Sequence, residues 1–173
     1  MRWRTWRESK AAVLQFGLQF GLLMILFYGL VLLPGYERVL SAYLEISARL
    51  SGVLLNWLGQ ECHVAGATIQ SARFAISVRK GCDAIEPAWF FCAAVLSFPA
   101  RWRRKGAGIL FGSAVLQGLN LVRIVSLYLI GRRFPPYFNI AHAEIWPVVF
   151  IVAAMVLWIR WIGWARGDDE LES

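Results

Sequence analysis

The run AAVLQFGLQFGLLMILFYGLVLL at residues 11–33 decides the fold class, because its 23 consecutive residues carry no charge. As a helix that rises about 1.5 Å per residue, it is about 34 Å long, enough to cross a hydrocarbon layer about 30 Å thick. No A-x-A cleavage site follows the run. Four basic residues precede it: Arg2, Arg4, Arg7 and Lys10. The run therefore predicts a permanent membrane span and not a secretory signal peptide.

The composition of the whole chain agrees with a membrane protein. Of its 173 residues 58% are hydrophobic and 17% are charged, and the mean hydropathy is +0.54, whereas soluble domains carry about a quarter of charged residues. We expect one membrane-embedded domain over residues 1–173, with a basic cytoplasmic tail at 1–10 and an acidic tail at 166–173. No basic stripe interleaved with aromatic residues lies outside the apolar runs, so lipid and not nucleic acid is the expected surrounding.

Three more apolar runs predict three more spans, at residues 82–100, 106–130 and 143–161. Residues 38–58 differ, because the charged residues Arg38, Glu45 and Arg49 interrupt the apolar ones. The apolar residues recur there at steps of three and four: Val39, Tyr43, Ile46, Leu50, Val53 and Trp57. This pattern favours an amphipathic helix at the interface or against the bundle. Whether it crosses the membrane stays open.

Residues 62–80 alternate with period two on either side of Ser71 and Ala72, which indicates a short β-hairpin at the membrane surface. The predicted fold class is thus an all-α polytopic membrane protein. It has about four transmembrane helices, one amphipathic helix and a short extracytoplasmic β-hairpin.

The basic residues predict the orientation. With four spans, ten Lys and Arg residues near the span ends lie on one side, in the N-terminal tail, at residues 101–105, and at Arg160 and Arg166. Seven lie on the other side, five of them spread over residues 34–81. The positive-inside rule therefore favours cytoplasmic N- and C-termini.

Three reactive side chains then reach the same outer level. Cys82 lies 19 residues before Arg101, Arg123 lies 18 residues after Lys105, and His142 lies 18 residues before Arg160. Each is about 27 to 29 Å above the cytoplasmic anchors of its helix. A thiol, a guanidinium and an imidazole at one level suit a nucleophilic site, although depth does not settle lateral proximity.

Arg123 requires a partner or a function, since an arginine in a span costs at least about 2.5 kcal/mol near the bilayer centre. It shares one face of its helix with Ser113, Gln117 and Asn120. This polar stripe indicates either a functional site or a structural seam between helices. Glu86, four residues after Cys82, and Asn120, three before Arg123, are candidate supporting residues that orient their neighbours.

The cysteines number three, Cys62, Cys82 and Cys92, with no CxxC spacing. Cys92 lies in an apolar run and is interpreted as a packing residue. A metal group of Cys62, His63, Cys82 and His142 is a weaker alternative, because no carboxylates in fixed spacing support it. We predict no metal and no cofactor.

Three segments carry a resemblance to a known family: RKGCDAIE at 79–86, QGLNLVRIVS at 117–126, and His142 four residues before Trp146. In this order they resemble the exosortase and archaeosortase family of membrane cysteine transpeptidase-like enzymes, most closely the exosortase H branch. One departure is Asp83-Ala84, where the family commonly has Ser or Asn followed by Gly.

The resemblance implies a bacterial inner-membrane enzyme with its active site facing the periplasm. Its partners would be exported proteins with a C-terminal sorting signal made of a motif, a transmembrane helix and a basic end. Cys82 would be the nucleophile, His142 the general base and Arg123 the group that holds the thiolate or oxyanion, with Glu86 orienting one of the latter two.

The residues by themselves add one expectation, a lowered pKa for Cys82 at a helix start beside a cation. Two alternatives stay open. One is a transporter or channel that uses the polar stripe around Arg123, and the other is a scaffold for envelope assembly. The substrate motif, the acyl acceptor, the balance of hydrolysis and transfer, and the oligomeric state are not predicted.

Overall fold

The computed structural model describes residues 2–167, with side chains from Lys10 to Arg166. The side chains of the basic tail before Lys10 and the acidic residues after Gly167 lie outside this description. Six α-helices are described: α1 (Arg2–Val31), α2 (Tyr36–Trp57), α3 (Ile85–Ser97), α4 (Trp102–Arg133), α5 (Phe138–Ile140) and α6 (Trp146–Gly167). A 3₁₀ turn at Pro135–Tyr137 and a π-helical turn at Ala141–Ile145 join α4 to α6.

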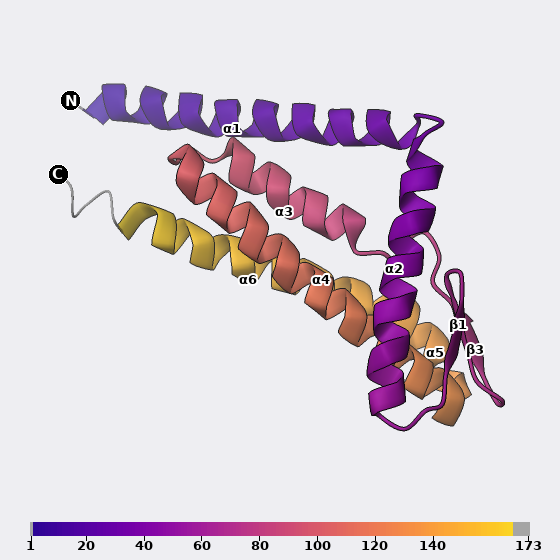
Figure 1. Ribbon diagram of the computed structural model, residues 1–173. Coiled ribbons are helices and arrows are strands. Elements are labelled where there is room, and N and C mark those ends of the chain that lie inside the picture. The colour runs from indigo at the N-terminus through magenta and orange to yellow at the C-terminus, as the bar shows by residue number, and fades with distance from the viewer. Residues whose placement is uncertain (1, 168–173) are drawn as a thin grey trace.

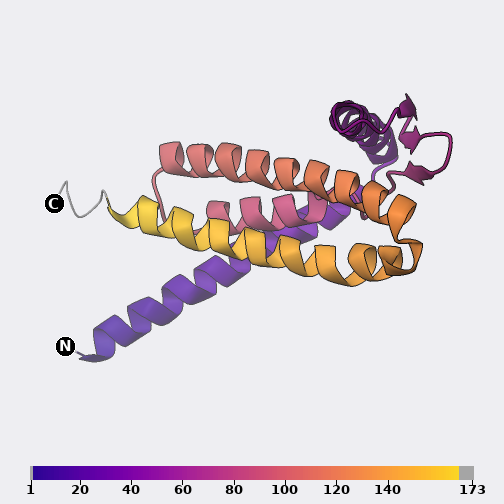
Figure 2. The ribbon, with the colours of Figure 1, turned by 90° about the horizontal axis from the view of Figure 1, so that it is seen from below.

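Helices α3, α4 and α6 run side by side, and α1 packs on α3 at an angle to them (Figures 1 and 2). The start of α1 and the end of α6 lie at the same end of this bundle. Phe27 stacks on Trp89 with ring centroids 5.2 Å apart, and the Trp89 indole donates to the carbonyl of Leu23 at 3.1 Å. These contacts hold α1 against α3.

Within the described residues three helical segments are long and apolar enough to cross a membrane, Lys10–Val31, Trp102–Arg133 and Pro135–Arg166. The predicted span at 82–100 forms a shorter apolar helix, Ile85–Ser97, of 13 residues, about 20 Å long. Its ends have local causes. Phe98 is extended, as a residue before proline prefers, and Ala84 has a left-handed backbone conformation.

Helix α2 lies across one end of the bundle, as the two perpendicular views show (Figures 1 and 2). It is not among the segments that meet the criteria for a span. Most of the predicted apolar stripe points outward, with Val39 at 70% and Trp57 at 81% exposure. The side that packs on the protein is instead the one that holds Leu40, Leu44, Ala48 and Leu55. Hydrophobicity could not distinguish these sides, because lipid and protein both accept apolar side chains.

The predicted β-hairpin is present, and within the described residues one more short strand precedes it, so that the hairpin belongs to an antiparallel sheet of three strands. Strands β1 (His63–Ala65), β2 (Thr68–Gln70) and β3 (Ala75–Ser77) follow in that order, with Ile69 facing both Val64 and Ile76. The extra turn forms at Gly66, whose φ of +57° suits glycine. The second turn is at the predicted break.

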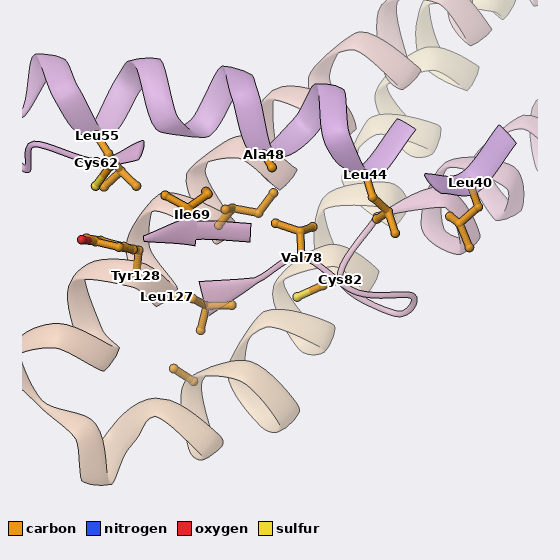
Figure 3. Close-up of a cluster of buried hydrophobic side chains, with 12 residues drawn as sticks. Leu40, Leu44, Ala48, Leu55, Cys62, Ile69, Val78, Cys82, Leu127 and Tyr128 are labelled. Carbon is orange, nitrogen blue, oxygen red and sulfur yellow. The ribbon is translucent and has the colours of Figure 1, made fainter. Parts of the chain in front are cut away.

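Two buried clusters form the core. One joins α2, the sheet and the end of α4, and it contains Ile69, Val78, Leu127, Tyr128 and also Cys82 (Figure 3). The other joins α3, α4 and α6. There a Cβ on Gly108 would lie 2.2 Å from the Trp161 ring, and one on Gly112 would lie 2.1 Å from Phe91. These glycines let α4 approach its neighbours closely.

Candidate active site

The site begins with two side chains from distant parts of the chain. The Cys82 sulfur lies 3.3 Å from Nε2 of His142. Cys82 is 8% exposed and stands in the loop between β3 and α3, beside Val78 in Figure 3. This distance allows a proton to pass between the thiol and the imidazole.

His142 belongs to the π-helical turn Ala141–Ile145 that precedes α6. Such turns insert an extra residue and rotate the following side chains, and they are frequent at functional sites. The Phe138 ring lies parallel to the imidazole, at 5.9 Å between centroids and 4° between planes. One face of His142 is therefore held by an aromatic ring.

Arg123 comes from α4 and is 5% exposed. One terminal nitrogen donates to the backbone carbonyl of His142 at 3.5 Å, and the guanidinium lies 5.7 Å from the centroid of the Phe150 ring. Its Nε is buried and has no hydrogen-bond partner among the described residues. The guanidinium thus keeps donor capacity beside the Cys82–His142 pair.

The loop that holds Cys82 is built around Asp83. The Asp83 carboxylate accepts from the backbone amides of Gly81 at 3.0 Å and Ile85 at 2.9 Å. Ala84 follows with φ of +56°, in the region that glycine adopts more easily. At this position, where the resembled family commonly has Gly, the chain thus has an alanine in a left-handed backbone conformation.

Tyr43 of α2 is a site neighbour that the sequence analysis placed only on an apolar stripe. Its hydroxyl lies 2.5 Å from the carbonyl oxygen of Asp83 and also contacts the side-chain oxygen of Gln117. The amide of Gln117 donates to the Ser47 hydroxyl at 3.5 Å. Helix α2 thereby ties the cysteine loop to the polar stripe of α4. The feature of the sequence that could have indicated this contact is the phenol hydroxyl of Tyr43, because a buried tyrosine hydroxyl needs a hydrogen-bond partner.

The expected lowering of the Cys82 pKa is wrong. Burial of the thiol raises its pKa, and the carboxylate of Asp83 adds to this effect, while the charge of Arg123 lowers it. Desolvation disfavours the charged thiolate, and Cys82 precedes the first residue of α3 by three positions, outside the first turn. The resting thiol is therefore protonated, and any reaction through its thiolate would need a base.

The two predicted supporting residues differ in their surroundings. Asn120 is fully buried, and neither of its side-chain polar atoms has a hydrogen-bond partner in the described part of the chain. Glu86 is exposed and makes no ion pair with Arg123 or hydrogen bond with His142 among the described residues. It is not one helical turn from Cys82, because α3 begins at Ile85.

A pocket of about 640 Å³ lies beside the site, lined by residues of α1, α3, α4 and α6. Its walls are mostly apolar and include Tyr28 of α1, Phe90 of α3 and Ile151 of α6. Arg123 and the neighbours of Cys82, Gly81 and Asp83, line the same pocket. A ligand in this mostly apolar pocket would thus find one cationic group, Arg123, in its lining.

The other cysteines lie elsewhere. Cys62 is buried against α2, and its backbone amide donates to the side chain of Asn56 at 2.6 Å. The sulfur of Cys92 lies 3.5 Å from the Ser113 hydroxyl, between α3 and α4. All three thiols are free. In the described residues no three His, Cys, Asp or Glu side chains are grouped so that they could hold a metal ion.

These features define a polytopic helical membrane protein with a cysteine–histidine pair, of which the cysteine is buried and the histidine half-buried, at one end of its bundle. Comparison with protein families matches residues 9–159 to the family described as transmembrane exosortase (Exosortase_EpsH). The chain belongs to this family, and the predicted family is thereby confirmed. Searches of curated proteins and of solved structures gave no match. Exosortases in general are cysteine transpeptidase-like and sort exported proteins that carry C-terminal signals.

Proposed function

We propose that this protein is a cysteine peptidase or transpeptidase that cleaves exported proteins at a C-terminal sorting signal. The signal would consist of a motif, a transmembrane helix and a basic end, and the reaction would take place at the periplasmic face of the inner membrane. The observation that carries the proposal is the 3.3 Å contact between the Cys82 sulfur and Nε2 of His142. Assignment to the exosortase H branch stays a prediction.

The first half of the reaction makes a thioester. His142 accepts the thiol proton while the Cys82 sulfur attacks the carbonyl carbon of the scissile peptide bond. The oxygen of the tetrahedral intermediate becomes negative, and donors of Arg123 stabilise it. The C–N bond then breaks, and the leaving amine takes the proton from His142. This order suits a buried thiol that is protonated at rest.

The second half regenerates the enzyme. A nucleophile, either an amine acceptor or water, gives a proton to His142 and attacks the thioester carbonyl. The C–S bond breaks, and the proton returns to the Cys82 sulfur. The pocket supports a substrate with an apolar segment, because its lining is mostly apolar and also includes Arg123. Asn120 is proposed to orient Arg123 from the same helix. Glu86 lines the pocket and is proposed to contact the substrate there, because it makes no ion pair with Arg123 and no hydrogen bond with His142 among the described residues.

The test is co-expression with a candidate exported protein that carries such a tripartite signal, followed by its mass. Cys82→Ala is expected to abolish processing while the enzyme still accumulates in the membrane. Cys62→Ser and Cys92→Ser are the matched controls and are expected to keep most of the activity, because neither sulfur contacts a histidine among the described residues. Processing by Cys82→Ala at the wild-type rate would rule out thiol catalysis and favour the transporter or scaffold alternative.

A further inference from the structure

The edge of the sheet at β3 presents backbone groups that nothing in the described residues uses. Strand β3 pairs with β2 on one side only. The carbonyl of Phe74 accepts from Ser71, and the amide of Val78 donates to the carbonyl of Ala67, so these two residues face β2. Because hydrogen bonding alternates along an antiparallel strand, Ile76 also faces β2, and Ala75 and Ser77 direct their N–H and C=O groups outward.

A groove of about 410 Å³ runs along this free edge. One wall is β3 with Arg79, and the other is formed by Pro135 and Phe138 from the turn between α4 and α6. Gly131 also lines the groove and lets the Phe74 ring pack closely on α4, because a Cβ there would lie 2.3 Å from that ring. The edge is therefore exposed along a channel, where an extended chain can lie beside it.

The groove adjoins the candidate catalytic pair. Phe138, which lines it, is the residue whose ring stacks on His142. At the other wall, the amide of Cys82 donates to the carbonyl of Arg79 at 2.9 Å, so the strand leads into the cysteine loop. A chain that lies along β3 thus has both reactive side chains near one end of its path.

We propose that the free edge of β3 binds an extended segment of the substrate as an added antiparallel or parallel strand. The amides and carbonyls of Ala75 and Ser77 supply the main-chain hydrogen bonds, and the apolar groove walls contact alternate side chains. The proposal rests on the proposed function, because the occupant is the peptide next to the scissile bond. The alternative occupant, the β3 edge of a second copy, is an outcome of the test.

Disulfide cross-linking tests the pairing without turnover. In the enzyme, Ser77→Cys is combined with Cys62→Ser, Cys82→Ala and Cys92→Ser, so that position 77 carries the only thiol. In the tripartite-signal protein, a series of variants places one cysteine at each successive position of the segment that precedes the transmembrane helix. Side chains of a strand alternate between faces, so cross-links are expected at every second position. Arg49→Cys, on the exposed side of α2, is the matched control and is expected to give no such pattern.

Equal cross-linking of Ser77→Cys to consecutive positions of the substrate segment, or no cross-linking at all, would contradict the proposal that this segment binds as an added strand. Cross-links between two copies of the Ser77→Cys chain in the absence of the tripartite-signal protein would overturn it in favour of self-pairing. These results do not depend on catalysis. Failure of the wild-type enzyme to process the protein, with alternating cross-links retained, would instead contradict the proposed function.

Proline substitution tests the hydrogen bonds themselves. Ala75→Pro with Ser77→Pro removes two outward amides, which an edge strand tolerates because neither amide faces β2. At limiting substrate concentration, the processing rate of the double variant is expected to fall about tenfold or more, because two hydrogen bonds to the substrate are lost. Ala72→Pro places a proline in the turn of the same hairpin and is expected to process normally. Equal processing by the double variant and the Ala72→Pro control would refute the proposal.

Discussion

Opposing effects act on the thiol of Cys82. Burial raises its pKa, while the positive charge of Arg123 lowers it. Both effects depend on spatial positions that the sequence does not reveal, because Cys82 lies in the loop before α3 and Arg123 lies in α4. The balance leaves a protonated thiol beside His142, so the proposed mechanism requires the histidine as a base.

Arg123 variants separate its charge from its geometry. Arg123→Leu removes the charge that favours thiolate, so the Cys82 pKa is expected to rise further and alkylation by iodoacetamide to begin at higher pH. Arg123→Lys retains the charge and is expected to keep the alkylation profile near the wild type. It loses the fixed fork of donors, so turnover is expected to fall by on the order of 10² to 10³.

The measurements are the pH dependence of alkylation, in a Cys62→Ser, Cys92→Ser background, and turnover per molecule of accumulated enzyme. An unchanged alkylation profile in Arg123→Leu would show that the guanidinium does not act on the thiol. Wild-type turnover in Arg123→Leu would remove Arg123 from the mechanism and leave Cys82 and His142 to be tested alone.

At the scale of the elements, the start of α3 is the segment whose backbone departs most from ordinary geometry near the site. Ala84 has φ of +56° and is 4% exposed. A left-handed conformation costs an L-residue about 1 to 2 kcal/mol, and glycine avoids this cost. Asp83 holds the turn through two hydrogen bonds to backbone amides.

Ala84→Gly is therefore expected to change the free energy of unfolding little, since release of the strain offsets the loss of a buried methyl group worth about 0.8 kcal/mol. Ala88→Gly, one turn later in regular helix, has no strain to release. It is expected to lose about 1 to 2 kcal/mol. SDS titration in mixed micelles compares the two. Equal losses would mean that Ala84 is not strained.

Helix α2 illustrates how an element can be predicted while its orientation is not. The spacing indicated an amphipathic helix, and α2 extends over Tyr36–Trp57. Its packed side includes small residues, and a Cβ on Gly52 would lie 2.4 Å from Val64. Close contact with the sheet, not hydrophobicity alone, selects the side that packs on the protein.

At the scale of the whole molecule, the arrangement of α1, α3, α4 and α6 brings the start of α1 and the end of α6 to one end of the bundle (Figures 1 and 2). Cys82, Arg123 and His142 meet toward the other end. The charge count predicts that the first end faces the cytoplasm. The proposed processing of exported proteins requires this orientation.

Single cysteines in a background without native thiols test the orientation. Gln70→Cys in β2 and Tyr137→Cys near α5 are expected to react with an impermeant thiol reagent in intact cells, and Arg103→Cys at the start of α4 is not. All three positions are exposed in the structure, so a lack of reaction reports sidedness and not burial. Labelling at 103 from outside would reverse the orientation and contradict a periplasmic active site.

The sequence by itself determined the membrane character and the family. Uncharged runs are decisive because each charge in lipid is costly, and this is a property of a single segment. The common depth of Cys82, Arg123 and His142 stays a prediction, because the helical rise on which it depends does not extend to Cys82, which precedes α3. The prediction of a span at 82–100 was less accurate, because hydropathy does not register the turn at Ala84 or the extended Phe98.

Only the tertiary structure decided which side chains meet. The 3.3 Å contact of Cys82 with His142 joins residues 60 positions apart, and it depends on how α4 and α6 pack and on the π-helical turn that rotates His142. The contact of Tyr43 with the cysteine loop and the free edge of β3 arise in the same way. Rotation about a helix axis and lateral position are set by all neighbours at once, so no single segment of sequence contains them.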